Sequence, residues 1–261
     1  MFFRNRTSAN GDDIAMLKWR GRSDAGNTHD YADIYVETQD VADGAEDGRL
    51  HLRTSVAGST TKRITMDSTC TTINDESKDL DFRVESDTNT HALFVQGSDG
   101  NVGIGTAAPA APLHVVSTDD GETLRLESTD AGAGLAPDLI FKRTSASPAT
   151  GDNLGSIRFL GTNVNDDGDS ATKAEHEFAD IYARANDVTL NTEDGELYFR
   201  TFLAGTQRRR LDLTPTESAF NEDAQDINFR VEGVGETHAL FVQGSDGKVG
   251  IGTNAPDHTL E

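Results

Sequence analysis

The stretch LDFRVESDTNTHALFVQGSDGNVGIGT, Leu80–Thr106, recurs 147 positions later as INFRVEGVGETHALFVQGSDGKVGIGT, Ile227–Thr253. The two stretches share 20 of 27 residues. Self-similarity at a fixed spacing indicates a chain built from repeated structural units. We therefore expect one fold that the chain forms twice.

The repeat extends toward the N-terminus at the same spacing. ADIY at Ala32–Tyr35 recurs at Ala179–Tyr182, and GRLHLRTSVAG at Gly48–Gly58 recurs as GELYFRTFLAG at Gly195–Gly205. Farther upstream the spacing falls to 140 and then to 137, which indicates insertions of seven and three residues. Insertions of this kind are tolerated in surface loops.

The repeat predicts the domain organisation. We expect an incomplete first module over residues 1–106, a complete second module over 107–253, and the start of a third over 254–261. A chain that starts inside one unit and stops inside another is expected to be a piece of a longer repetitive protein.

Strand patterns fill both copies. Apolar and polar residues alternate in SIRFLG (Ser156–Gly161), in RLDL (Arg210–Leu213) and in TLRLES (Thr123–Ser128). Such alternation over four to eight residues is typical of a strand with one buried face. Asp-Gly pairs such as Asp99-Gly100 separate the runs, because glycine supplies the positive φ of a tight turn.

Helical patterns are nearly absent. Gln39–Glu46 and Ala171–Phe178 are each long enough for one helical turn, but neither carries a sustained apolar stripe. The sequence therefore predicts an all-β fold with little or no helix.

Composition limits how such a fold can be stabilised. Leu, Ile, Val and Phe are 55 of the 261 residues, and the net charge is −22. A chain this acidic and this poor in apolar residues is near the range of disordered proteins. Because the strand patterns are clear, we expect it to fold instead by sharing a thin core, and by pooling strands, with partner chains.

The charge balance also excludes several functions. Nucleic-acid binding needs clustered Lys and Arg, and so does docking on anionic membranes, so neither is expected. No run approaches the roughly 18 apolar residues of a membrane-spanning helix, and Met1–Ala9 is too short for a signal peptide. A single cysteine, Cys70, allows no intrachain disulfide, which is consistent with assembly in a reducing cytoplasm.

The VGIGT segment of each copy is the candidate for packing between chains. Alternate glycines in a strand suggest that another backbone presses against one face, which in a fibre would be that of a neighbouring chain. A bulged or frayed edge strand is the alternative. The residues predicted to pack between chains are Val102, Gly103, Ile104, Gly105, Val249, Gly250, Ile251 and Gly252.

These residues carry a resemblance to a known family. GNVGIGTAAPAAPLHV, Gly100–Val115, resembles the linker of phage tail-fibre proteins, where it often precedes an intramolecular chaperone domain. LGSIRFLG, ADIYA, DGELYFRTFLAG and RRLDL are similar to shaft repeats of the same proteins. Together the two resemblances cover most of the chain.

The resemblance implies an elongated homotrimeric fibre of tandem β-modules. It implies a structural shaft segment, in a virion assembled in the host cytoplasm, that presents a receptor-binding end and contacts other virion proteins. Two alternatives stay open: a module that binds host surface glycan through loops such as Thr162–Ala174, and a repeat of a bacterial fibrous adhesin. We expect no enzyme activity and no cofactor.

Three further side-chain patterns are weak indications of a binding site: a calcium-loop pattern, histidines that recur in register, and the single tryptophan. Asn163, Asn165, Asp167 and Asp169 alternate as in the front half of a calcium loop, but Ala174 stands where its bidentate Glu should be. We expect a solvated loop there.

Histidines and aromatic residues also recur in register. His29 pairs with His176 and His91 with His238 at the repeat spacing, but each stands alone, so structural or solvent-facing roles are expected. Trp19, the sole tryptophan, has Phe159 as its counterpart, which fits a core position better than a sugar-stacking platform. No arrangement of nucleophile and base is recognisable.

Overall fold

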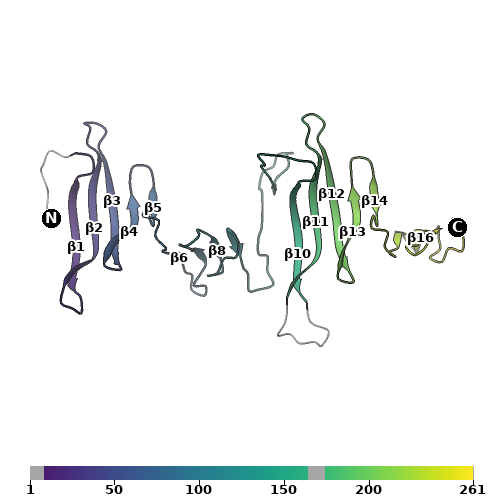
Figure 1. Ribbon diagram of the computed structural model, residues 1–261, viewed down its shortest axis with the longest axis horizontal. Helices are drawn as coiled ribbons and strands as arrows, with labels where there is room; N and C mark the ends of the chain where they lie inside the picture. The colour runs from purple at the N-terminus through teal and green to yellow at the C-terminus, as the bar shows by residue number, and fades with distance from the viewer. Residues whose placement is uncertain (1–8, 164–173, 261) are drawn as a thin grey trace. The chain divides into compact units, whose positions relative to one another are not determined.

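The computed structural model describes residues 9–163 and 174–260 of the chain. All regular structure in these residues is β-strand, which confirms the predicted fold class (Figure 1). The chain divides into two compact units, Met1–Ala131 and Gly132–Glu261. No helix in the described residues is long and apolar enough to cross a membrane.

The first unit begins with a five-stranded antiparallel sheet in which each strand pairs with the next along the chain. Its strands are β1 (Asp13–Arg22), β2 (Thr28–Asp40), β3 (Asp47–Val56), β4 (Ser59–Met66) and β5 (Thr71–Ile73). The alternating segments of the sequence form these strands, and short polar turns join them.

A small four-stranded sheet follows in the same unit. It consists of β6 (Phe82–Val84), β7 (Leu93–Val95), β8 (Val102–Ile104) and β9 (Leu113–Val115). β8 and β9 are parallel, with Val102 opposite Leu113, whereas the other pairs are antiparallel. The Asp-Gly turn between β7 and β8 forms as predicted, with Gly100 at a φ of 77°.

The second unit repeats this order of strands. Its five-stranded sheet consists of β10 (Asn153–Thr162), β11 (Glu175–Asp187), β12 (Asp194–Leu203), β13 (Thr206–Leu213) and β14 (Ser218–Phe220). Its small sheet consists of β15 (Phe229–Gly233), β16 (Glu236–Val242) and β17 (Val249–Gly250). A parallel bridge joins Val249 to Leu260, at the place of the β8–β9 pair in the first unit.

The two large sheets also share their irregularities. The register shifts after Trp19 in β1 and after Phe159 in β10, and again after Leu52 in β3 and Phe199 in β12. A β-bulge adds one residue to a strand and re-aims the side chains beyond it. Because the bulges match, a residue of the first sheet and its aligned residue in the second sheet lie on corresponding faces of their own sheets.

Two sequence predictions are not reproduced. TLRLES was predicted to be a strand, but no strand forms between Val115 and Asn153, all of which the structure describes. Neither candidate helical turn appears in the described residues: Gln39 and Asp40 are the last two residues of β2, and Phe178 lies within β11.

Candidate functional site

Each large sheet has one apolar and one polar face, and these two faces are the candidate functional surfaces. The apolar face is defined by a row of side chains that crosses all five strands. In the first sheet this row is Leu17, Ile34, Leu52, Ile64 and Ile73. In the second sheet it is Ile157, Ile181, Phe199, Leu211 and Phe220.

The apolar face is open to solvent in the single chain. Leu17 is 57% exposed at one edge of the first sheet, and Ile73 is 43% exposed at the other. Trp19 and Phe159, which were predicted to be core residues, lie at matching places on this face and are 49% and 53% exposed. Contiguous exposed apolar surface of this kind marks an interaction site.

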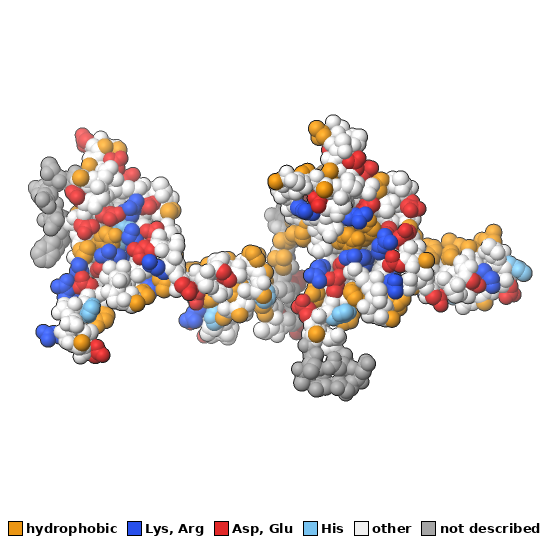
Figure 2. Space-filling model, viewed as in Figure 1, with side chains coloured by type: hydrophobic (Ala, Val, Ile, Leu, Met, Phe, Trp, Pro, Cys, Tyr) orange, Lys and Arg blue, Asp and Glu red, His pale blue; other side chains and the backbone are white. Residues whose placement is uncertain are grey.

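The polar face carries the most buried side chains of the sheets. Figure 2 shows that Lys, Arg, Asp and Glu side chains gather over the strands of each sheet. Asp33 and His51 in the first sheet, and Asp180 and Asp212 in the second, are at most 4% exposed. The usual arrangement, in which the apolar side is buried, is thus reversed in the single chain.

An ion pair stacked on two aromatic rings forms the centre of the polar face. Arg53 donates two hydrogen bonds to Asp33, at 2.7 and 2.8 Å, and its guanidinium lies over the ring of Tyr35. Tyr35 in turn stacks on His51. The positively charged guanidinium is attracted to both the carboxylate and the face of the ring.

The second sheet reproduces this stack with one substitution. Arg200 pairs with Asp180 through two hydrogen bonds and lies over Tyr182, 4.0 Å from the ring centroid. Tyr182 stacks on Tyr198, with centroids 4.5 Å apart. Tyr198 stands where the first sheet has His51, and burial together with the neighbouring Glu196 raises the pKa of Tyr198 to about 12.

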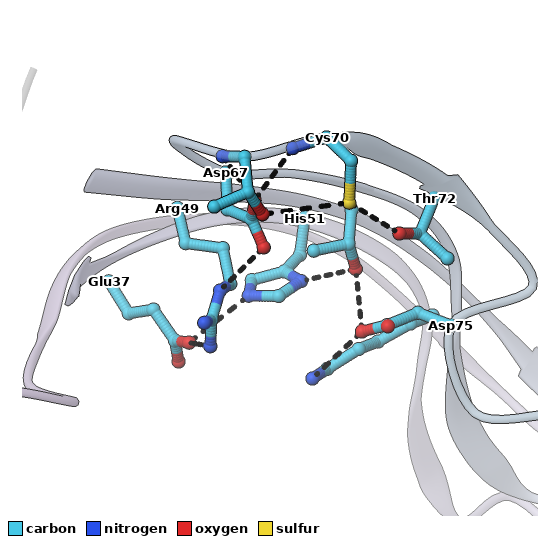
Figure 3. A network of polar contacts seen from close by, with 10 residues as sticks. Glu37, Arg49, His51, Asp67, Cys70, Thr72 and Asp75 are labelled. Atoms are coloured by element: carbon cyan, nitrogen blue, oxygen red, sulfur yellow. Dashed lines mark hydrogen bonds and ion pairs between the residues drawn. The ribbon is translucent and has the colours of Figure 1, made fainter. Parts of the chain in front are cut away.

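His51 is the centre of a polar network in the first sheet (Figure 3). Its Nδ1 lies 2.9 Å from the hydroxyl of Thr65, and that hydroxyl lies 3.0 Å from Asp75 Oδ2. Its Nε2 lies 3.3 Å from Glu37 Oε1. Burial lowers the pKa of His51, so the imidazole is held in its neutral form at pH 7.

Charged groups surround this imidazole. Arg49 donates to Glu37 at 2.8 Å and lies 3.7 Å from Asp67, and Lys62 lies 3.5 Å from Asp75. Hydrogen bonds from the hydroxyl and amide of Thr69 lower the pKa of Asp67 to about 2.

The network brings together a hydroxyl, an imidazole and a carboxylate. Thr65, His51 and Glu37 have the order of groups found in nucleophilic hydrolases, and sequence inspection had not found them because they lie on three strands. However, His51 is 0% exposed and Thr65 only 3%. A substrate cannot reach the hydroxyl in this arrangement, and Asp212 replaces Thr65 in the second sheet.

The second sheet has a shallow groove on its polar face, with a volume of about 420 Å³. Arg158 pairs with Glu177 there at 2.6 Å, and Gln207 donates to Glu177 at 3.0 Å. Ser156 lines the groove, at the position that Met16 holds in the first sheet. The smaller serine leaves space that the methionine side chain would occupy.

The VGIGT segments have close neighbours within their own chain. A Cβ on Gly103 would lie 2.4 Å from the carbonyl oxygen of Thr106, and one on Gly250 would lie 2.4 Å from that of Thr253. The expected close backbone is therefore present, and here it is the segment's own. Val102, Gly103, Ile104, Gly105, Val249, Gly250, Ile251 and Gly252 as trimer-packing residues stay a prediction.

Three of the four recurring histidines contact aromatic rings. His91 lies edge-on to Phe94 and His238 to Phe241, at centroid distances of 5.4 and 5.5 Å. His176 contacts Phe178 and Phe202. These contacts give the histidines packing roles.

The calcium candidates fall mostly outside the structure. Asn163 accepts a hydrogen bond from the amide of Ala174, whereas Asn165, Asp167 and Asp169 lie outside the described residues. In the part of the chain that the structure describes, no three His, Cys, Asp or Glu side chains are grouped as metal ligands.

Comparison with solved structures finds seven matching chains, two of which are domains of a bacteriophage tail fibre. The carboxy-terminal domain of the bacteriophage T5 L-shaped tail fibre aligns with a TM-score of 0.33 and 8% identity, covering 89% of each chain. The same domain with its intramolecular chaperone domain aligns with a TM-score of 0.33 and 8% identity, covering 88% of this chain and 59% of that one. No protein-family model and no curated protein matches the sequence.

Proposed function

We propose that this chain is a structural shaft segment of a trimeric viral tail fibre, which spaces a receptor-binding end from the virion and presents it to the host. The sequence resemblance of Gly100–Val115 and of the strand segments to tail-fibre linkers and shaft repeats supports this role. The partners are then two further copies of the chain and other virion proteins. The protein is assembled in the host cytoplasm and becomes extracellular on release.

The open apolar face of each large sheet is the observation that carries the proposal. Each face presents a row of five aliphatic or aromatic side chains, and burial of one such side chain contributes about 1.5–3 kcal/mol. Within the described residues, only Tyr35, Phe94, Ala185, Tyr198 and Phe241 are buried hydrophobic residues. A chain with so small a core of its own gains stability when its apolar faces are covered.

Three copies around one axis cover these faces without leaving one open. Each sheet turns its apolar face toward the axis and contacts the other two, so the assembly closes. The polar faces then point outward, where their charges keep an acidic fibre soluble. The repetition of the same two-faced sheet along the chain fits a spacer, in which each unit has the same mechanical task.

We also propose that the chain has no enzyme activity. Thr65, His51 and Glu37 are interpreted as a structural network because their burial leaves no access for a substrate. Incubation with host polysaccharide should release no reducing ends, and Thr65→Val should leave that result unchanged. Release that depends on Thr65 or on one carboxylate would contradict the structural role.

The oligomeric mass tests the proposal directly. One chain has a mass of 28.1 kDa, so sedimentation equilibrium should give about 84 kDa for a trimer. The mass should persist at micromolar concentration and be lost together with the β-sheet signal on denaturation. A compact, cooperatively folded monomer of 28.1 kDa would exclude the trimeric shaft.

The groove on the second sheet supports a second candidate function, binding of host glycan. It offers the guanidinium of Arg158, the carboxylate of Glu177 and the amide of Gln207 as hydrogen-bonding groups for sugar hydroxyls. Ser156→Met copies the first sheet and should fill the groove. Glycan-array binding that this substitution abolishes would favour the binding module over the spacer.

A further inference from the structure

We propose that one face of the small sheet in each unit packs against the same face of other copies of the chain, as a second contact beside that of the large sheets. This inference rests on the proposed trimer, and it names a further part of the chain that holds the copies together. Three observations carry it. The face is apolar throughout, it continues the apolar face of the large sheet, and it is the same in both units.

The register of the first small sheet places its apolar side chains on one side. Leu113, Val84 and Ile104 on this side are 61%, 43% and 41% exposed, so the unit does not cover it. Residues two apart in a strand share a face. All eight positions of the two rows on this side are therefore apolar, and we call them the small-sheet face. They are Phe82, Val95, Val102 and Leu113 in one row, and Val84, Leu93, Ile104 and Val115 in the other.

The glycine inside β8 lies on the other side of this sheet. Gly103 is aligned with Phe94 and, through it, with Arg83. The backbone that approaches Gly103 is that of its own chain, at the carbonyl oxygen of Thr106. Of the VGIGT residues that were predicted to pack between chains, this proposal therefore keeps the valine and the isoleucine and assigns the glycine to packing within the chain.

The small-sheet face continues the apolar face of the large sheet within each unit. Ile73, which ends the apolar row of the first large sheet, lines a cavity of about 360 Å³ together with Phe82 and Val95. In the second unit Phe220 and Phe229 hold the places of Ile73 and Phe82, and their ring centroids are 4.8 Å apart. A partner that covers the large-sheet face therefore also reaches the edge of the small-sheet face.

The small-sheet face has the same residues in both units. The two repeated stretches of 27 residues differ at seven positions, and all seven lie outside the two rows. The apolar row of the large sheet, by contrast, keeps its residue type only at Ile34 and Ile181. The residues of the face in the second unit are Phe229, Val231, Leu240, Val242, Val249, Ile251 and Leu260.

This repetition favours a second copy of the chain as the partner. A partner that covers the face in both units must itself offer two matching surfaces in succession. Another copy offers them automatically, because it carries the same two small sheets. Where identical faces meet around one axis, each substitution is present in every copy, so the packing constrains all of them together. A small sheet with strands of three residues is also marginal alone and gains stability when its face is covered.

The reactivity of introduced thiols tests the contact. Val84 and Arg83 are neighbours in β6 that lie on opposite faces, and their exposures in the single chain are similar, at 43% and 50%. In a Cys70→Ser background, the thiol of Val84→Cys should react with a maleimide on the order of tenfold more slowly than that of Arg83→Cys, because it is reached only when the contact opens. Val231→Cys and Arg230→Cys repeat the comparison in the second unit, and urea should abolish both differences.

Added charge gives a second test. Val84→Asp combined with Val231→Asp places a carboxylate in the face of each unit and should lower the temperature at which the assembly dissociates. Ser98→Asp combined with Ser245→Asp is the matched control, because it adds the same charge at exposed turn positions of the same small sheets. An equal dissociation temperature for the two double variants would contradict the contact.

The outcomes separate this inference from the proposed function. A monomeric mass of the natural chain removes both, whether or not the thiols are protected. A trimeric mass in which the thiols of Val84→Cys and Val231→Cys react as fast as those at the arginine positions overturns the small-sheet contact and leaves the trimeric shaft standing. Protection at the arginine positions instead would place the contact on the opposite face and would also overturn the inference.

Discussion

The imidazole of His51 lies parallel to the phenol ring of Tyr35, with the two ring centroids 4.3 Å apart and the ring planes at 20°. The second sheet makes the same contact between Tyr182 and Tyr198, at 4.5 Å and 16°. One sheet thus places a titratable ring where the other places a ring that stays neutral over the physiological range. The two modules are therefore expected to respond differently to acid.

The first prediction concerns this pH response. Burial lowers the pKa of His51 below its ordinary value of 6.5, and the nearby Arg49 and Lys62 act in the same direction, against the opposite effect of Glu37. The unfolded chain then binds the proton more readily than the folded chain, so the free energy of unfolding falls as the pH drops below about 6.5. Thermal melts followed by circular dichroism between pH 7.5 and 5 should show this loss.

The control is His51→Tyr, which copies the second sheet. Glu37 has a lowered pKa, so its own contribution is lost only as the pH falls further, below its ordinary 4.5. The loss between pH 6.5 and 5 should therefore be smaller in His51→Tyr than in the natural chain. An equal loss in both would assign the effect to other histidines.

The second prediction concerns the ion pair of the polar face. Arg200→Ala removes the ion-pair partner of the Asp180 carboxylate, which is 4% exposed and keeps only the neutral amide of Gln207, at 3.2 Å, as a side-chain hydrogen-bond donor. Removing one partner of a buried pair costs about 3 kcal/mol, because the remaining charge is uncompensated. Urea denaturation should show this decrease in the free energy of unfolding, while Arg125→Ala, in a pair whose side chains are 65% and 64% exposed, should change it by less than about 0.5 kcal/mol. Equal effects of the two substitutions would contradict the importance of burial.

The third prediction concerns the apolar face. Ile181 lies at the centre of the second sheet, opposite both Ile157 and Phe199. Ile181→Asp places a charge between the copies and should convert the trimer to smaller, less stable species, as measured by sedimentation. Val234→Asp, at a fully exposed turn position, should keep the natural mass. A trimer that tolerates Ile181→Asp would place the contact between chains elsewhere.

The fourth prediction concerns the glycines of the VGIGT segments. Gly103→Ala brings a Cβ within 2.4 Å of the carbonyl oxygen of Thr106, so the backbone must shift. Overpacking of this kind costs about 1–3 kcal/mol. Gly134→Ala is the control, because a Cβ there meets nothing within 4 Å. Similar melting temperatures for the two variants would show that the segment relaxes without strain.

Much of the fold follows from short-range patterns. The repeat spacing predicts that β2 and β11 are equivalent strands, and the alternation of Ile157 with Arg158 predicts which residues share a face. Both features are local, because side chains of a strand point alternately to its two sides. The pattern does not tell which face is covered, and the burial of the polar face was therefore not foreseen.

The network around His51 required the tertiary structure. Glu37, His51 and Thr65 come from three strands, and only the register of β2, β3 and β4 brings their side chains together. The segment TLRLES is the opposite case, in which the sequence pattern predicts a strand that the structure does not contain. Its alternation indicates a strand, but a strand forms only where another strand supplies the hydrogen bonds, and no sheet of the described residues includes this segment.

The sequence by itself determined the repeat, the all-β class and the division of each strand into an apolar and a polar side. These follow from residue order, since the periodicity of two is a property of the extended backbone. The tertiary structure decided that Asp33, His51 and Asp180 are buried, whereas the rows through Ile34 and Ile181 face solvent. Long side chains of Arg and Tyr can cover a carboxylate on their own sheet, but the flat rows of Ile and Leu need a second surface to cover them.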